Sequence, residues 1–164
     1  MRAISLHEAN TIIAGTFAAA AEHKCHALAA IVLDAGGRVK AFQKQDGASL
    51  MRFEVAYGKA FAALAMGRSS RMVLQKQREK PVFIQNLEAL ADGPMFLEGG
   101  GQLIRDQSGE VVGAVGVTGD VNEMDDICAI AGIRAAGFRA DDDFDDAATQ
   151  RLNIKKGPPL KDPR

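Results

Sequence analysis

The stretch Glu98–Gly119, EGGGQLIRDQSGEVVGAVGVTG, determines the architecture that this sequence predicts. Its two apolar runs, Gln102–Arg105 and Val111–Thr118, are separated by residues whose types favour a chain reversal. The two runs are therefore predicted to form a β-hairpin. Glycine recurs at every third residue late in the second run, and glycine weakens a strand interior unless another element approaches closely. We therefore expect a helix to pack tightly against this strand, with no room for a β-carbon at Gly116.

A second hairpin and five helices are predicted from similar patterns. The apolar run Leu28–Leu33 and the alternating segment Val39–Gln43 flank an Asp-Ala-Gly-Gly turn, so they should pair in the same sheet. Ser5 and Glu8 form a capping-box pattern at the start of the first helix. Apolar spacing, caps and proline stops predict the others. The predicted helices run from residue 5 to about 23, from Ser49 to about Met66 with Leu50 and Phe53 on its inner side, from Ser69 or Ser70 to Glu79, from Val82 to Leu90, and from about Asp125 to Phe138.

The chain of 164 residues is long enough for one domain but short for two. All the predicted strands and helices lie within residues 1–140. The segment 141–164 contains two aspartate clusters, a Lys-Lys-Gly-Pro-Pro run and few apolar residues. We expect this segment to be a C-terminal tail or an arm that contacts another chain.

Composition and charge argue against several classes of protein. The 20 lysines and arginines are balanced by 21 aspartates and glutamates, so net charge does not favour nucleic acid or an anionic membrane as a partner. No run of about eighteen apolar residues occurs, and the N-terminal apolar residues have helical spacing, so neither a membrane span nor a signal peptide is expected. Cys25 and Cys128 form no CxxC pair, which leaves a reducing cytoplasm as the expected compartment.

The glycine-rich strand and the acidic segment after it each have a structural and a chemical interpretation. Glycines before a helix can cradle a phosphate, but the spacing matches no nucleotide motif and the following acidic residues would repel an anion, so packing is favoured. Glu123, Asp125 and Asp126 could bind a metal ion. The alternative, that they are first-turn residues stabilised by the helix dipole, is favoured.

His23 and Lys59 also have two interpretations each. His7, His23 and His26 are the only histidines, and they form no zinc-binding pattern. His23 lies one turn beyond Ala20, at the edge of an apolar stripe, so it is either a helix-end surface residue or a single axial ligand of haem iron. Lys59 either extends to solvent, which is favoured, or points into a pocket as an anion partner or an amine catalyst.

Several short motifs occur together in an order that is typical of one known family. They are Val32–Gly37, Asp46–Ala48, Lys59 with Ala60, Gly99–Gly101, Gly109–Gly119, and Asp125 with Asp126 before Ala129. Through these motifs the segment from Leu6 to Phe138 resembles the GlcG/HbpS-like family, which includes haem-binding HbpS-like proteins and the C-terminal domain of PduO-type proteins.

The resemblance implies an α+β, profilin-like fold with an antiparallel sheet of about five strands flanked by helices. It also implies a homo-oligomer, from a dimer to an octamer. Some members of the family bind haem through a histidine near the end of the first helix, and His23 is the corresponding position here. The sequence departs from the family at Leu103, where proline is usual, and it contains no E-x-x-E iron-binding pattern.

Two classes of function follow from this resemblance. The first is a binding protein for a small ligand, namely haem or a related tetrapyrrole, with His23 as the metal ligand. The alternative is an accessory enzyme of the isomerase, lyase or hydratase type that acts on a small organic acid. Its pocket would lie beside the glycine-rich strand. The ligand-binding positions named for the two classes are His23, Asp34, Lys59, Gly116, Thr118 and Asp125.

Overall fold

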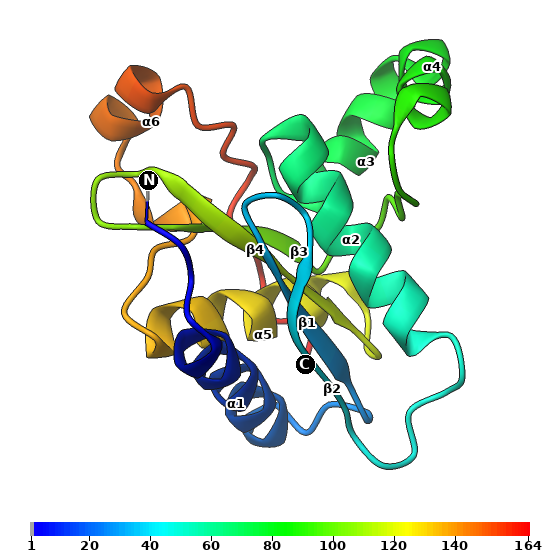
Figure 1. Cartoon of the computed structure of the whole chain (residues 1–164), viewed down its shortest axis with the longest axis vertical. Helices are drawn as coiled ribbons and strands as arrows, with labels where there is room; N and C mark the ends of the chain where they lie inside the picture. The colour runs from blue at the N-terminus through cyan, green and yellow to red at the C-terminus, as the bar shows by residue number, and fades with distance from the viewer. Residues whose placement is uncertain (1) are drawn as a thin grey trace.

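The computed structural model describes residues 2–164 and places one antiparallel sheet between layers of helices (Figure 1). The strands are β1 (Ala29–Asp34), β2 (Val39–Lys44), β3 (Gly101–Arg105) and β4 (Val111–Thr118), in the sheet order β2-β1-β4-β3. The helices are α1 (Leu6–Glu22), α2 (Arg52–Met66), α3 (Ser70–Glu79), α4 (Pro81–Leu90), α5 (Asn122–Ala135) and α6 (Asp146–Leu152), with a 3-10 turn, η1, at Asp141–Asp143.

Both predicted hairpins form, and they share one sheet because β1 pairs with β4. The α+β class is therefore confirmed, with four strands where about five were expected. Side chains alternate across β1, with Ala30 and Val32 packed toward α1 and α5, and Ile31 and Leu33 packed toward α2. A sheet that is covered on both faces explains why β1 is a continuous apolar run.

The helix α1 starts where the capping-box pattern predicted. The Glu8 amide donates to Ser5 Oγ at 3.1 Å, and the Ser5 amide donates to Glu8 Oε2 at 2.9 Å. Its contact with α5 is close, because a β-carbon on Gly132 would lie 2.4 Å from the carbonyl oxygen of Ile12. Small residues thus bring two helix backbones together on this face of the sheet.

Gly116 faces a helix, as expected, and this helix is α2. A β-carbon on Gly116 would lie 2.0 Å from the carbonyl oxygen of Ala56. Neighbouring residues of a strand face opposite sides of the sheet, and Gly116 falls on the side that α2 covers. The glycine-rich strand therefore accommodates the middle of α2.

The start of α2 differs from the prediction. The helix begins at Arg52 with Met51 as its N-cap, not at Ser49. Leu50 and Phe53 were both predicted to face inward, but they are 87% and 39% exposed. Residues 45–51 connect β2 to α2. The predicted helix therefore started about three residues too early. Pro81, by contrast, stops α3 as predicted and occupies the first turn of α4.

Residues 141–164 lie against the rest of the same chain. Phe144 and Ile154 are buried, and Arg105 Nε lies 2.6 Å from the carboxylate of Asp141. The segment contains α6. Residues 153–164, here called the C-terminal strap, then run back without regular structure towards the end of α1 (Figure 1). Whether it also contacts another chain stays a prediction.

Candidate functional site

Lys59 lies inside the protein, in the middle of α2, with only 3% of its side chain exposed. Its ammonium group donates to the carbonyl oxygen of Val117 at 3.0 Å and to Asp125 Oδ2 at 3.0 Å. The favoured expectation that Lys59 extends to solvent is therefore wrong, because its ammonium group pairs with Asp125 inside the chain. The helix backbone is pressed against β3 here, since a β-carbon on Gly101 would lie 2.2 Å from the Lys59 carbonyl oxygen.

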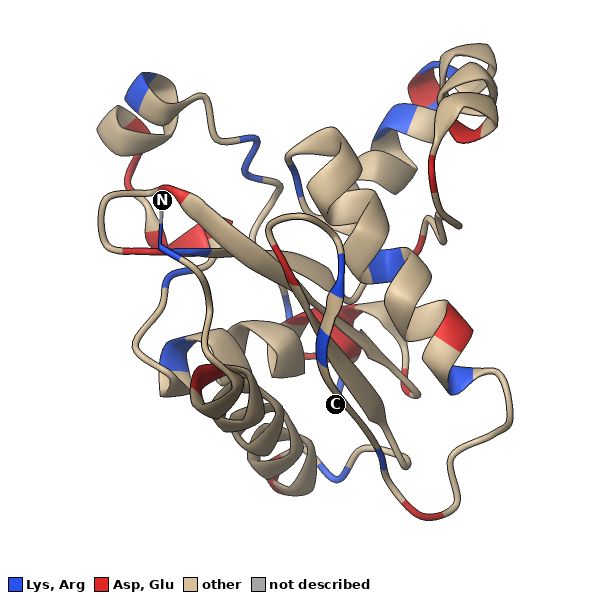
Figure 2. Cartoon of the chain, in the orientation of Figure 1, with Lys and Arg blue, Asp and Glu red and all other residues tan. Residues whose placement is uncertain are grey.

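Asp125, in the first turn of α5, neutralises this lysine. Its second oxygen, Oδ1, accepts a hydrogen bond from the Asp120 amide at 3.1 Å. Burial raises the pKa of Asp125 to about 6, although Lys59 acts to lower it. The acidic residues at the start of α5 form a red group behind the sheet in Figure 2. Because both carboxylate oxygens have donors, the pair of Lys59 and Asp125 connects α2 to α5 and presents no free group to a ligand.

Asp126 follows directly but binds the triple-glycine loop instead. Its Oδ1 accepts hydrogen bonds from the Gly100 amide at 2.8 Å and from Gln102 Nε2 at 2.7 Å. Gly100 has a φ of +120°, a conformation that favours glycine and that allows the loop to turn at this carboxylate. Burial raises the pKa of Asp126 to about 6. Within residues 2–164, no group of three or more His, Cys, Asp or Glu residues is placed to hold a metal ion.

A groove of about 390 Å³ lies beside Asp126, between α3 and α5. Sequence reasoning missed this site, although two signals pointed to it. Neighbouring residues on a helix point about 100° apart, so two successive aspartates cannot both face Lys59. The triple glycine also marks a place where backbone and side chain meet closely. The lining residues are Arg71, Met72, Leu74, Gln75, Arg78, Gly99, Asn122, Glu123, Asp126, Pro158 and Leu160.

The structure brings Gly116, Thr118, Lys59 and Asp125 together, but not Asp34. Gly116 and Thr118 are buried under α2, and Thr118 Oγ1 lies 3.5 Å from an Arg52 nitrogen. Asp34 lies at the other end of β1, where its Oδ1 accepts from the Gly36 and Arg38 amides in the β1–β2 turn. Asp34 therefore stabilises a turn. It pairs with Gly113, at the opposite end of the β1–β4 pairing from Thr118.

His23 is the C-cap of α1 and lies at the surface, with 29% of its side chain exposed. Its Nδ1 lies 2.8 Å from Oδ2 of Asp162, in the C-terminal strap. The pKa of Asp162 is lowered, mainly by a hydrogen bond from the Arg164 amide and also by His23. Within residues 2–164, Nε2 of His23 makes no hydrogen bond. One ring nitrogen is thus fixed and the other is available.

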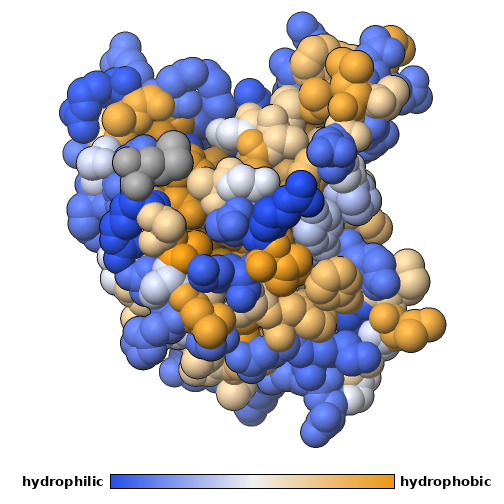
Figure 3. Space-filling model, viewed as in Figure 1, coloured by the Kyte–Doolittle hydropathy of each residue, from blue (hydrophilic) through white to orange (hydrophobic). Residues whose placement is uncertain are grey.

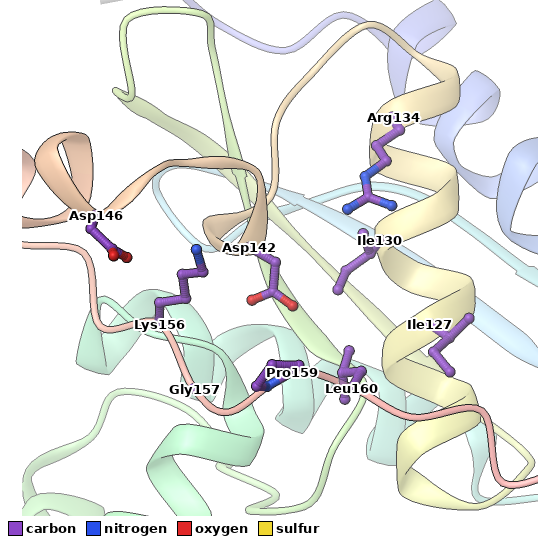
Figure 4. A pocket seen from close by; sticks show the side chains of 9 residues that line it. All are labelled: Ile127, Ile130, Arg134, Asp142, Asp146, Lys156, Gly157, Pro159 and Leu160. Atoms are coloured by element: carbon purple, nitrogen blue, oxygen red, sulfur yellow. The ribbon is translucent and has the colours of Figure 1, made fainter.

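A larger cavity, of about 580 Å³, lies between α5 and the C-terminal strap (Figure 4). Ile130 points into it from α5, and Asp142 points into it from η1 (Figure 4). Three of its charged groups have partners in the chain, since Arg134 pairs with Asp143, Asp142 lies 3.6 Å from Arg71, and the Lys156 ammonium donates to the Phe144 carbonyl. Polar groups of this cavity therefore hold the strap in place.

Comparison with known proteins identifies relatives of this fold. The family model described as "Haem degrading protein HbpS-like" matches residues 4–134. The structure of a PduOC:Heme complex is 23% identical, with 84% of this chain and 97% of that chain covered and a TM-score of 0.72. The Klebsiella pneumoniae protein ORFY is 23% identical, with 84% and 92% covered and a TM-score of 0.74. HbpS is 22% identical, with 82% and 90% covered and a TM-score of 0.71.

No functionally curated protein matches this chain. At these identities the solved structures establish a shared fold. The family model extends from Ile4 before α1 to Arg134 in the last turn of α5, and so includes every strand and the whole cluster around Lys59. It ends before the C-terminal segment that supplies Asp162. The chain belongs to the HbpS-like family.

Proposed function

We propose that this protein binds haem or a related tetrapyrrole, with His23 as the axial ligand. The observation that carries the proposal is the contact of 2.8 Å between His23 Nδ1 and Asp162. Metal-binding histidines typically donate their second ring N–H to a carboxylate, which fixes the ring and makes the ligating nitrogen more basic. In His23 the ring nitrogen Nδ1 contacts such a carboxylate, and Nε2 lies on the opposite side of the ring.

The donor set fits a haem iron better than a free metal ion. A single imidazole suffices as an axial ligand of haem, whereas a zinc site needs three or four protein ligands. A bound haem would supply the iron and its redox chemistry, while His23 and Asp162 would orient the group. The family description refers to haem degradation, and one relative of the same fold was crystallised with haem, which supports the same ligand class.

A second chain is part of this proposal, because His23 lines neither of the two cavities described above. Figure 3 shows hydrophobic residues exposed on the face formed by β2 and the start of α2. Val39, Leu50, Met51 and Phe53 are exposed there, and β2 is an edge strand of the sheet. Contiguous apolar surface and free strand edges are typical of subunit interfaces. We infer a homo-oligomer, between a dimer and an octamer, in which a neighbour covers the second side of the ligand.

The environment of the chain is also inferred. Within residues 2–164, no helix combines the length and the apolar character that crossing a membrane requires. We propose a cytoplasmic location, for which the cysteine content of the sequence is the argument.

The alternative, an enzyme that uses Lys59 or Asp125 on a small organic acid, has less support from the geometry. A catalytic amine must be accessible to its substrate, and a lysine that binds an anion must not already be neutralised by another carboxylate. Lys59 instead donates to Val117 and Asp125, and both charged side chains are almost fully buried. A site for a small acid therefore has to use other residues.

Titration with hemin, followed by absorbance, tests the proposed function. The wild type should give a shifted Soret band that saturates at a fixed ratio of hemin to chain. His7→Ala and His26→Ala are matched controls and should retain this shift, whereas His23→Ala should lose it. A wild type without a shift, or a His23→Ala variant that titrates like the wild type, would refute the assignment.

A further inference from the structure

The floor of the groove between α3 and α5 is a carboxylate oxygen that has no hydrogen-bond partner in the described part of the chain. Asp126 is 1% exposed, and both of its described hydrogen bonds go to Oδ1. Within residues 2–164, Oδ2 has no hydrogen bond. It lies beside Gly99, where a β-carbon would be only 2.6 Å away. The absence of a side chain at Gly99 thus leaves Oδ2 open to the groove, which Asp126 lines.

The two arginines of the groove differ in whether their guanidinium groups already have partners within the chain. Arg71 donates from Nη1 to the Pro158 carbonyl at 2.8 Å, and its Nη2 lies 3.6 Å from Asp142. Its guanidinium therefore holds the C-terminal strap over the groove. Arg78, about two turns further along the same face of α3, is exposed. Within residues 2–164 it makes no ion pair. Arg78 is the cation that remains available to an anionic ligand.

Apolar side chains line two sides of the groove between these two groups, and Gln75, Asn122 and Glu123 line it as well. Met72 and Leu74 line the groove from α3, and Pro158 and Leu160 line it from the strap. At about 390 Å³ the volume falls at the lower end of the range for ligand pockets. A suitable occupant is therefore small, has a short apolar body, and carries a negative charge at one end and a hydrogen-bond donor at the other.

We propose that this groove binds a small hydroxycarboxylate, whose hydroxyl group donates to Asp126 Oδ2 and whose carboxylate pairs with Arg78. This site is distinct in its residues from the proposed site at His23 and needs no haem. A buried carboxylate that lacks a partner on one oxygen discriminates strongly for a ligand with a hydroxyl group, because a ligand without it leaves that oxygen desolvated and unpaired. Asp126 is thus the residue that determines specificity, and Arg78 supplies attraction for the anion.

The test uses 2-hydroxyisocaproate as the probe and isocaproate, which lacks the hydroxyl group, as its matched control. Each is titrated into the full chain without haem, and amide shifts are recorded by two-dimensional NMR. The hydroxyacid should move the amides of Gly99 and Gly100, and its dissociation constant should be about tenfold lower than that of isocaproate, a typical effect of one hydrogen bond to a charged group. Equal binding of the two acids, or no shift of these amides with either, would overturn the proposal.

Three variants locate the two contacts. Asp126→Asn keeps an oxygen for the Gly100 and Gln102 donors but loses the accepting Oδ2, so it should bind both acids with similar affinity. Arg78→Gln should weaken both acids together, while Arg151→Gln, an exposed arginine on α6, should change neither. Hydroxyacid binding that survives in both Asp126→Asn and Arg78→Gln would contradict the proposed contacts. Should Asp126→Asn fail to fold, the comparison of the two acids on the wild type still decides the question.

Discussion

Two contacts between a basic side chain and an aspartate have similar geometry but very different surroundings. Lys59 and Asp125 are 3.0 Å apart, with 3% and 2% of their side chains exposed. His23 and Asp162 are 2.8 Å apart, with 29% and 42% exposed. Each pair connects segments that are distant in the sequence. Burial decides what each does, because an ion that loses its partner inside the protein is left desolvated, whereas water replaces the partner at the surface.

The buried pair should therefore control stability, and removing its cation should have the largest effect. Lys59→Met leaves Asp125 without a counterion and should lower the free energy of unfolding by about 3–5 kcal/mol. Urea unfolding followed by circular dichroism measures this change. In the double variant Lys59→Met, Asp125→Asn neither position of the pair carries a charge, so much of the loss should be recovered. A Lys59→Met protein as stable as the wild type would show that the pair is not needed.

The next prediction concerns the close approach of α2 to the sheet, which allows Lys59 to reach Asp125. Gly116→Val places a side chain against the Ala56 carbonyl and should push α2 away from the sheet. Overpacking typically costs about 1–3 kcal/mol, and the rigid backbone at this position favours the upper end. Differential scanning calorimetry should show a melting temperature lower by several degrees. Gly137→Ala is a useful comparison, because its loss would come from the φ of +81° and not from a clash.

A third prediction concerns pH and the second buried aspartate. The pKa of Asp126 is raised from 3.8 to about 6, so the folded state binds more protons than the unfolded state between these values. Its contribution to stability is therefore complete below about pH 4 and is lost as the pH rises through 6. Asp126→Asn cannot ionise and should exceed the wild type in stability at pH 7 by about 3 kcal/mol.

Denaturant unfolding at pH 4, 5, 6 and 7 gives this difference directly. The contributions of Asp125 and Asp141, whose pKa values are also raised, are common to both proteins and cancel. A difference between wild type and Asp126→Asn that stays constant from pH 4 to pH 7 would contradict the raised pKa.

The smallest effect on stability is expected at the surface pair. Asp162→Asn should change the free energy of unfolding by less than about 1 kcal/mol, as is usual for exposed pairs. It should nevertheless weaken hemin binding about tenfold, because the carboxylate orients the ring of His23. Glu110→Gln, at another exposed acid, is the control. A large loss of stability in Asp162→Asn would mean that the pair is structural after all.

Local signals in the sequence predicted most of the fold. The capping box at Ser5, the turn residues of both hairpins and the stop at Pro81 act within a few residues, so they could be recognised without knowledge of the rest of the chain. The direction of Lys59 could not, because it depends on Asp125, 66 residues away, and on how closely α2 approaches the sheet. The same holds for the C-terminal segment 141–164, whose position depends on Arg105 and Arg71.

The candidate site was predicted in part for the same reason. His23 could be recognised from its place at the end of an apolar stripe, but its partner Asp162 lies in a segment with no periodicity. Asp126 was interpreted as an acidic first-turn residue or, as the less favoured alternative, as a metal ligand. Its contacts with the glycine loop need a left-handed Gly100, which the sequence permits but does not specify.

The central claim is that Nε2 of His23 is the ligand, and imidazole rescue tests it most directly. His23→Gly removes the ring and leaves space beside Asp162 for free imidazole. We predict that His23→Gly with hemin lacks the Soret band of the wild type and that millimolar imidazole restores this band, while His26→Gly has it without imidazole. A His23→Gly variant that keeps the wild-type band without imidazole would contradict the account, since another residue would then hold the iron.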